Sequence, residues 1–193
     1  NVAKSFRSVL DRDPASLGEI EQREEYIDFL NREISRYVSK LISFETNEQG
    51  SAVVSSFFAI SGNIERIGDY GKKLLEYYAY RQNRPKDFSQ QAMTELSGMY
   101  AEAHHAIVTA LDGFINDDPD KAREVAPIAG KLRGLEVELR NRHIQRLDKQ
   151  ECDSETGLVY VDILGIIEHI GYHSNNVAKA TISSCTAEHK AKA

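Results

Sequence analysis

Two carboxylates stand four residues apart in the stretch from Ser61 to Tyr78, which reads SGNIERIGDYGKKLLEYY. In a helix this spacing puts Glu65 and Asp69 on one face, one turn apart. Two carboxylates arranged in this way can chelate a hard or borderline cation such as Mg²⁺, Mn²⁺ or iron. The alternative is a solvated acidic face on which Arg66 and Lys73 neutralise the pair. The spacing therefore predicts a site for a divalent or trivalent metal ion, with the acidic face as its competitor.

A second candidate set lies near the other end of the chain and consists of Asp162, Glu168, His169 and His173. The two histidines are four residues apart, a spacing that can hold Zn²⁺ or another transition metal. Mixed nitrogen and oxygen donors favour a softer ion than two carboxylates do. The alternative is that the histidines are exposed and hydrogen-bonded to water or to Asp162. We predict that Glu65 and Asp69 bind metal more strongly than this second set.

The two candidate sites belong to an internal repeat. The segment Ile167–Asn176 reads IEHIGYHSNN and matches the first stretch 103 residues later, with Glu168 at the position of Glu65 and Gly171 at that of Gly68. A proline-containing break at residues 11–14 also recurs at 116–119. Because a helical glycine costs up to ~1 kcal/mol relative to alanine, each glycine indicates a close approach of two helices. We divide the single domain into a first repeat, 1–86, and a second repeat, 87–193.

The helices that must position these residues are visible as apolar periodicity. In both motif stretches the apolar positions recur at alternating steps of three and four, which predicts a buried seam. The first seam is Val53, Phe57, Ile60, Ile64, Ile67, Gly71, Leu74 and Tyr78, and the second is Tyr160, Ile163, Ile167, Ile170, Ser174, Val177 and Thr181. Further helices are predicted at about 2–10, 14–44, 93–114 and 119–147, the 14–44 pattern resting on Ile27, Leu30, Ile34, Tyr37 and Leu41.

Short connections between long helices favour antiparallel neighbours in a bundle. The predicted fold class is therefore all-α, with two tandem antiparallel three-helix bundles related by a pseudo-two-fold axis. The first helix is expected to be truncated, since the chain begins at Asn1 in a helical pattern, and the sequence is interpreted as a piece of a longer protein.

The composition of the 193-residue chain narrows the classes of function. The net charge is −6 and the basic residues are dispersed, which argues against a nucleic-acid partner because such a groove needs a basic stripe. Two cysteines are too few for a disulfide scaffold, so a reducing cytosol is the default compartment. No apolar run approaches the ~20 residues that span a bilayer, and the fragment itself is expected to be soluble.

No catalytic constellation is visible in the sequence. There is no glycine-rich phosphate loop, no nucleophile with an evident base and no cofactor fingerprint, which predicts a non-enzyme. Of the remaining reactive residues, His143 is expected at the surface and Cys152 as a free thiol in a polar loop.

One segment of the second half carries a family resemblance. His143-Ile-Gln-Arg146-Leu147 is followed by a polar loop with Cys152 and Gly157, and then by a run from Asp162 to Gly171. Together with the repeated order helix–break–helix–turn–helix and the E-R-I-G-D of the first motif, this segment resembles the PhoU-like family. The resemblance covers nearly the whole chain. It is closest to the C-terminal cytoplasmic PhoU-like domain of bacterial sodium/phosphate cotransporters.

The resemblance implies a pair of three-helix bundles whose Glu-x-x-x-Asp carboxylates, here Glu65 and Asp69, bind multinuclear metal clusters. The second repeat departs from this pattern because Tyr172 stands at the aspartate position. The implied function is a cytoplasmic regulatory domain of a sodium-dependent phosphate transporter, at the cytoplasmic face of the plasma membrane. Its implied partners are the membrane domain of the same chain and a second copy in a homodimer.

Two alternatives remain beside this reading. The first is a free-standing PhoU-like regulator of phosphate uptake, which acts on a separate transporter. The second is a ferritin-like metal-binding bundle. The ferritin-like bundle is disfavoured because it needs Glu and Glu-x-x-His motifs that point into the core, whereas the Glu65 face is predicted to point away from the main seam.

Overall fold

The computed structural model describes residues 1–11, 17–44, 48–82 and 87–192, and these residues form helices and short connections only. The helices are α1 (Val2–Asp11), α2 (Leu17–Phe44), α3 (Glu48–Gln82), α4 (Gln90–Ile115), α5 (Pro119–Arg123), α6 (Val125–Asp148) and α7 (Ser154–Lys192). No strand occurs in these ranges, so the predicted all-α class is confirmed. Within the same ranges, no helix is both long enough and apolar enough to cross a membrane.

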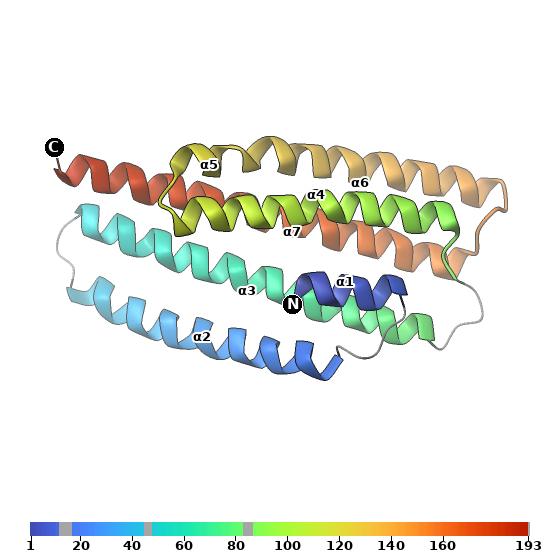
Figure 1. Ribbon diagram of the computed structural model, residues 1–193, viewed down its shortest axis with the longest axis horizontal. Helices are drawn as coiled ribbons and strands as arrows, with labels where there is room; N and C mark the ends of the chain where they lie inside the picture. Colours follow the sequence, from blue (N-terminus) through green and yellow to red (C-terminus); the bar gives the residue numbers. More distant parts are fainter. Residues whose placement is uncertain (12–16, 45–47, 83–86, 193) are drawn as a thin grey trace.

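Figure 1 shows two antiparallel groups of helices side by side, one of α1, α2 and α3 and the other of α4, α6 and α7. Each group ends in its motif helix, α3 or α7, and these two helices make the most extensive contact between elements in the described part of the chain. The short helix α5 extends the second group beside α4 and α7. Helix α1 has ten residues and lies along the C-terminal half of α3, whereas its counterpart α4 has 26 residues.

The predicted seams form the core where the two motif helices meet. Ile60, Ile67 and Leu74 are buried on α3, and Ile163 and Ile170 are buried on α7. Because their side chains recur at helical period on one face, each helix presents a continuous apolar stripe to the other layer.

One position of the predicted seam lies outside this core. Phe57 is exposed and contacts the Phe114 ring of α4 edge to face. The apolar period continues through Phe57, but this side chain lines an open groove between α2, α3 and α4, so the neighbouring helices cover it only in part.

The apolar pattern of α2 also differs from the expectation of a buried stripe. The large apolar side chains exposed on this helix are Tyr26, Phe29, Leu30, Ile34, Tyr37 and Leu41, whereas Ile20 and Val38 are buried. The reason is that α2 packs mainly against α3 and touches α1 only at one end. Four of the five predicted positions, Leu30, Ile34, Tyr37 and Leu41, are therefore exposed, because burial depends on how many helices cover a face.

The breaks between helices follow local chemistry. Ser89 caps α4 by accepting a hydrogen bond from the Ala92 N–H, and Asp118 caps α5, with Pro119 at the first helical position. The predicted single helix 119–147 is divided at Glu124 into α5 and α6. Pro127 explains the division, because it has no N–H to donate to the carbonyl four residues earlier. The corresponding Pro14 lies outside the described residues.

Candidate functional site

Helices α2 and α3 approach each other closely at Gly68. A Cβ added to Gly68 would lie 2.9 Å from Oε1 and 3.2 Å from Oε2 of Glu24 on α2. The glycine therefore leaves room for a carboxylate between the two helices. Glu24 is only 2% exposed, which is unusual for a glutamate.

Two further carboxylates point toward Glu24, Asp28 on α2 and Asp69 on α3. One oxygen of each lies within 4.8 Å of the others, and Asp28 and Asp69 are half-buried. Glu24 Oε2 accepts a hydrogen bond from Asn1 Nδ2 at 3.4 Å. Glu24 Oε1 is buried and accepts no hydrogen bond from the described part of the chain. We call these three residues the acidic cluster.

Burial and like charges act against a charged Glu24 in the acidic cluster, and the charge of Lys72 offsets them only in part. Burial raises the pKa of Glu24, the hydrogen bond from Asn1 lowers it, and the charges of Asp28 and Asp69 raise it again. Three convergent carboxylate oxygens are the donor set that hard cations such as Mg²⁺, Ca²⁺, Mn²⁺ and iron prefer. The cluster therefore fits a hard cation, and the buried Oε1 of Glu24 is the atom that lacks a partner.

The corresponding position in the second repeat has a different occupant. A Cβ added to Gly171 would overlap the Cδ1 atom of Leu132 on α6, and Leu132 is fully buried. The two glycines therefore allow the same close approach of helices, but a leucine takes the place of the buried carboxylate. No other group of three or more such donors occurs among the residues that the structure describes.

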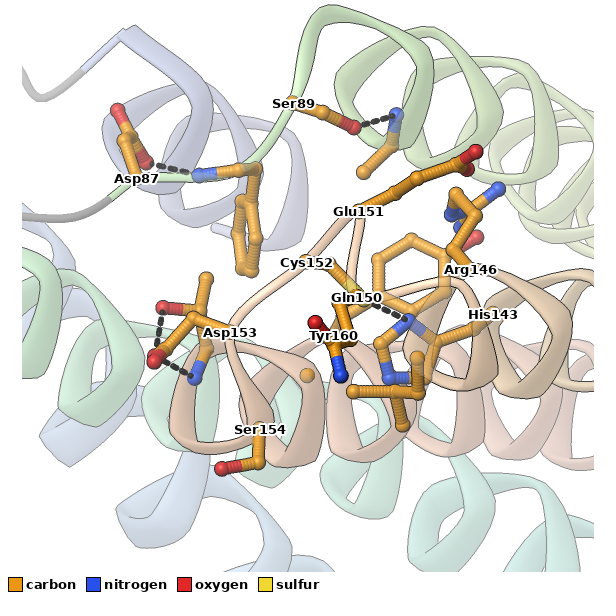
Figure 2. Close-up of a pocket in the computed structure, with 15 residues that line it drawn as sticks. Asp87, Ser89, His143, Arg146, Gln150, Glu151, Cys152, Asp153, Ser154 and Tyr160 are labelled. Carbon is orange, nitrogen blue, oxygen red and sulfur yellow. Dashed lines mark hydrogen bonds between the residues drawn. The ribbon is translucent and has the colours of Figure 1, made fainter.

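A second polar region lies at the end of the bundle where α4, α6 and α7 meet. It surrounds a pocket of about 640 Å³ that is lined by His143, Arg146, Cys152 and Tyr160 among others (Figure 2). Arg146 donates to both carboxylate oxygens of Glu95, at 3.0 and 2.9 Å, and the Tyr160 hydroxyl donates to Oε2 of Glu95 at 2.6 Å. All three side chains are nearly buried, so this polar network is internally satisfied.

This network explains the protonation state of Glu95. Burial acts to raise the pKa of this carboxyl, but the hydrogen bonds from Arg146 and Tyr160 outweigh burial and the pKa is lowered. Burial, followed by the contact with Glu95, raises the pKa of Tyr160 well above its ordinary value, whereas Arg146 lowers it. Glu95 is therefore held as a carboxylate, in contrast to Glu24.

Comparison with known proteins assigns this architecture to a family. The model of the PhoU domain matches residues 1–78 and 96–181. The chain belongs to the PhoU domain family. The match covers both repeats, and the predicted membership of the PhoU-like family is confirmed.

Two relatives extend the comparison. The chain is 24% identical, over 162 residues, to the phosphate-specific transport system accessory protein PhoU homolog 1 of Thermotoga maritima, with 83% of this chain and 69% of that protein aligned. It also matches the crystal structure of PhoU from Pseudomonas aeruginosa with a TM-score of 0.83 and 18% identity, covering 94% of this chain and 86% of that one. The structural match shows that this PhoU domain has the fold of PhoU.

The two residues predicted from the first motif, Glu65 and Asp69, lie in different surroundings in the structure of this chain. Asp69 belongs to the acidic cluster, where Arg66 Nη1 also approaches its Oδ2 at 3.8 Å. Glu65 lies one turn away and lines an apolar groove that includes Ile27 and Ile64. Burial and the charge of Asp69 raise the pKa of Glu65. Metal binding by Glu65 stays a prediction, and the structure brings Asp69 together with residues of another helix.

The residues predicted from the second motif each have a partner of their own. Glu168 is 3.7 Å from Arg133 Nε and 3.5 Å from His169 Nδ1. His173 Nδ1 lies 2.9 Å from Asn63 Oδ1, and Asp162 Oδ2 accepts a hydrogen bond from the Tyr77 hydroxyl at 3.2 Å. The His169 ring stacks on Tyr70. The structure does not bring these residues together as one donor group, and their metal binding stays a prediction.

Sequence reasoning missed Glu24 and Asp28 of the acidic cluster. A signal existed, since they have the same Glu-x-x-x-Asp spacing as Glu65 and Asp69. It also missed the network around Glu95. The expectation of a surface position for His143 was wrong, because His143 is 4% exposed and packs against the Tyr160 ring.

Proposed function

We propose that this PhoU domain regulates phosphate uptake as the cytoplasmic domain of a sodium-dependent phosphate transporter, and that it binds a hard metal cation in the acidic cluster. The phosphate part of the proposal draws on the name of the Thermotoga maritima relative, a phosphate-specific transport accessory protein. An accessory role also agrees with the prediction of a non-enzyme.

One observation carries the metal part of the proposal. Oε1 of Glu24 is buried and lacks a hydrogen bond from the described residues, and the Glu24 carboxylate lies beside those of Asp28 and Asp69. An unpartnered buried carboxylate costs free energy unless it is protonated or bound to a cation. A bound cation would be held by Glu24, Asp28 and Asp69, and would supply positive charge at the junction of α2 and α3.

The transporter part of the proposal is supported by the segment that carries the resemblance to cotransporter domains. His143, Arg146, Cys152 and Gly157 all line the pocket at the end of α6 and the start of α7. The spacing of these four residues along the chain therefore brings them together around one pocket. The competing proposal is a free-standing regulator, for which the accessory protein of Thermotoga maritima is the model.

Metal analysis tests the acidic cluster. Protein purified without chelator is compared with the double variant Asp28→Asn, Asp69→Asn by elemental analysis. The matched control is Asp120→Asn, Glu138→Gln, which alters two exposed carboxylates. We expect metal in the wild type and the control, and its loss from the cluster variant. Equal metal content in the wild type and the cluster variant would contradict the site.

Phosphate uptake tests the biological role. The full gene that encodes this domain is expressed in cells, and uptake of labelled phosphate is measured with and without sodium. A transporter domain predicts new sodium-dependent uptake, which the cluster variant alters. A free-standing regulator instead predicts no new sodium-dependent uptake and a changed rate through the transporters that the cells already have. An unchanged rate in both media would contradict a role in phosphate uptake.

A further inference from the structure

A thiol and an imidazole face each other at the pocket between α4, α6 and α7. Cys152 Sγ lies 3.8 Å from Nδ1 of His143, and Figure 2 shows the two side chains directed at each other. His143 comes from the last turns of α6, whereas Cys152 comes from the connection that leads to α7. Cys152 is half-buried and is not in a disulfide.

The imidazole of His143 is held in this direction by packing. Its ring lies 5.2 Å from the Tyr160 ring, centroid to centroid. On the other side, a Cβ at Gly157 would overlap Nε2 and Cε1 of His143, so only glycine leaves space for the ring. Within the described part of the chain, the thiol of Cys152 is the one hydrogen-bonding group in contact with this buried imidazole. The His143 imidazole is therefore more than nine-tenths buried, and its hydrogen-bonding contact is with the Cys152 thiol and not with a stronger donor or acceptor.

The charges around the pair are mixed, with the Arg146 guanidinium acting against the carboxylates of Glu151 and Asp153. Burial raises the pKa of the Cys152 thiol, Arg146 lowers it, and the carboxylates of Glu151 and Asp153 raise it. Burial and the nearby Arg146 charge also lower the pKa of His143, which keeps its imidazole neutral. A neutral imidazole is the form that ligates metal ions. A protonated thiol is a poor nucleophile, whereas a metal ion deprotonates the thiol that it binds.

We propose that Cys152 and His143 bind a transition metal ion that prefers thiolate and imidazole ligands, with Zn²⁺ as the representative ion. With Zn–S and Zn–N bonds of about 2.3 and 2.0 Å, a tetrahedral ion places sulfur and nitrogen about 3.5 Å apart. The observed 3.8 Å requires a shift of only a few tenths of an ångström. On binding, the thiol releases its proton to solvent and the sulfur forms the metal bond.

The two protein ligands leave coordination positions that open toward the pocket of about 640 Å³. Glu151 lines the same pocket and is adjacent to Cys152 in sequence, but its carboxylate does not lie within 4.8 Å of both donors, so its side chain would have to move to become a further ligand. This site is separate from the acidic cluster, which offers oxygen donors only, and it does not depend on the proposed function.

Cobalt titration tests the site, because Co²⁺ substitutes for Zn²⁺ and a thiolate ligand produces a charge-transfer absorption that carboxylates do not. The full chain, reduced and freed of metal, is titrated with Co²⁺ and then with Zn²⁺. We expect a charge-transfer band that saturates at one equivalent and disappears when Zn²⁺ is added. The band should be lost in Cys152→Ser and in His143→Gln.

Three controls distinguish this site from others. Cys185→Ser removes the other thiol and His105→Gln removes an exposed histidine, and both should keep the band. Asp28→Asn, Asp69→Asn should also keep it, because the acidic cluster has no sulfur. Gly157→Ala displaces the imidazole without removing a ligand, and should weaken Co²⁺ binding roughly 10–100-fold, as changes to ligand-orienting groups do.

A second measurement protects the test against misfolded variants. In wild-type protein, Zn²⁺ should slow the reaction of Cys152 with iodoacetamide while the rate at Cys185 is unchanged, as followed by mass spectrometry of peptides. The absence of a cobalt band in the wild type overturns the proposal. So does a band that persists in Cys152→Ser, or equal alkylation rates of Cys152 with and without Zn²⁺.

Discussion

The motif glycines occupy equivalent positions in the two repeats, but a carboxylate packs against one glycine and an apolar side chain packs against the other. In the first repeat, Gly68 of α3 faces the carboxylate of Glu24 on α2. In the second repeat, Gly171 of α7 faces the apolar side chain of Leu132 on α6. The glycine determines how closely the helices approach, and the residue on the neighbouring helix determines whether the contact is a candidate ion site or hydrophobic core.

The second repeat buries its own carboxylate elsewhere. Glu95 lies at the end of the bundle and is paired with Arg146 and Tyr160, whereas Glu24 lies at mid-bundle beside two more carboxylates. The pKa of Glu95 is lowered and that of Glu24 is raised. Two buried carboxylates in one domain therefore respond to pH in opposite directions, because one has cationic and hydroxyl donors and the other has like charges.

The largest effect is expected when the carboxylate of the first repeat is placed in the second. Leu132→Glu puts an ionisable group at a fully buried position beside Gly171. An uncompensated buried charge typically destabilises by about 3–5 kcal/mol. Urea denaturation measures the change. The control is Leu158→Glu on α7, which is 70% exposed and should change the free energy of unfolding by less than about 0.5 kcal/mol. Similar losses of unfolding free energy in the two variants would show that the position beside Gly171 is not an apolar site that rejects a carboxylate.

A smaller loss is expected when the buried ion pair of the second repeat is broken. Glu95→Gln leaves the guanidinium of Arg146, whose side chain is only 10% exposed, without its carboxylate. Loss of a charged partner at a buried site should lower the free energy of unfolding by about 2–3 kcal/mol. Glu138→Gln, which breaks the exposed pair with Arg142, should cost less than about 0.5 kcal/mol. An equal loss of unfolding free energy in the two variants would show that the buried Glu95 network stabilises the fold no more than an exposed ion pair does.

The pH dependence of stability should distinguish the two carboxylates. The pKa of Glu24 is raised above 4.5, so its contribution is fully present below 4.5 and is lost as pH rises through the folded pKa. Glu95 has a lowered pKa, so its contribution is present above 4.5 and is lost as pH falls through the folded pKa.

Glu24→Gln should therefore stabilise metal-free protein at pH 7 by on the order of 1 kcal/mol, and should remove the decline of stability above pH 4.5. Glu95→Gln should instead flatten the loss of stability in acid. Thermal or urea unfolding of chelator-treated protein from pH 3 to 8, values chosen to bracket the ordinary carboxyl pKa of about 4.3, provides the comparison. Identical pH profiles for the two variants would contradict the opposite environments.

The smallest effect on stability is expected from the glycines themselves. Alanine at Gly68 or Gly171 gains up to about 1 kcal/mol of helix propensity but must displace Glu24 or Leu132, so the net change should stay within about 1 kcal/mol. The two variants should differ in metal content. Gly68→Ala pushes the Glu24 carboxylate out of place, whereas Gly171→Ala displaces only the apolar side chain of Leu132. Elemental analysis checks this difference, and equal metal content in the two variants would argue against ion binding beside Gly68.

The sequence by itself determined the features that depend on neighbours along one helix. Apolar period predicted the all-α class and the seam of Ile60, Ile67 and Leu74, because burial of one helix face repeats every three or four residues. The sequence also predicted that Glu65 and Asp69 share one helix face and that a helix begins at Pro119, because both features depend on residues close together in the chain. The resemblance to the PhoU family also rested on order and spacing along the chain.

Only the tertiary structure decided which helices those faces meet. Asp69 joins Glu24 and Asp28 because α2 crosses α3 at Gly68, and no spacing within one helix specifies that crossing. His143 is buried beside Cys152 because α7 turns back over α6 at Gly157. A helical period states which side of a helix is apolar, but the chemistry of a site arises between helices, where the partner, the distance and the exclusion of water are set by packing.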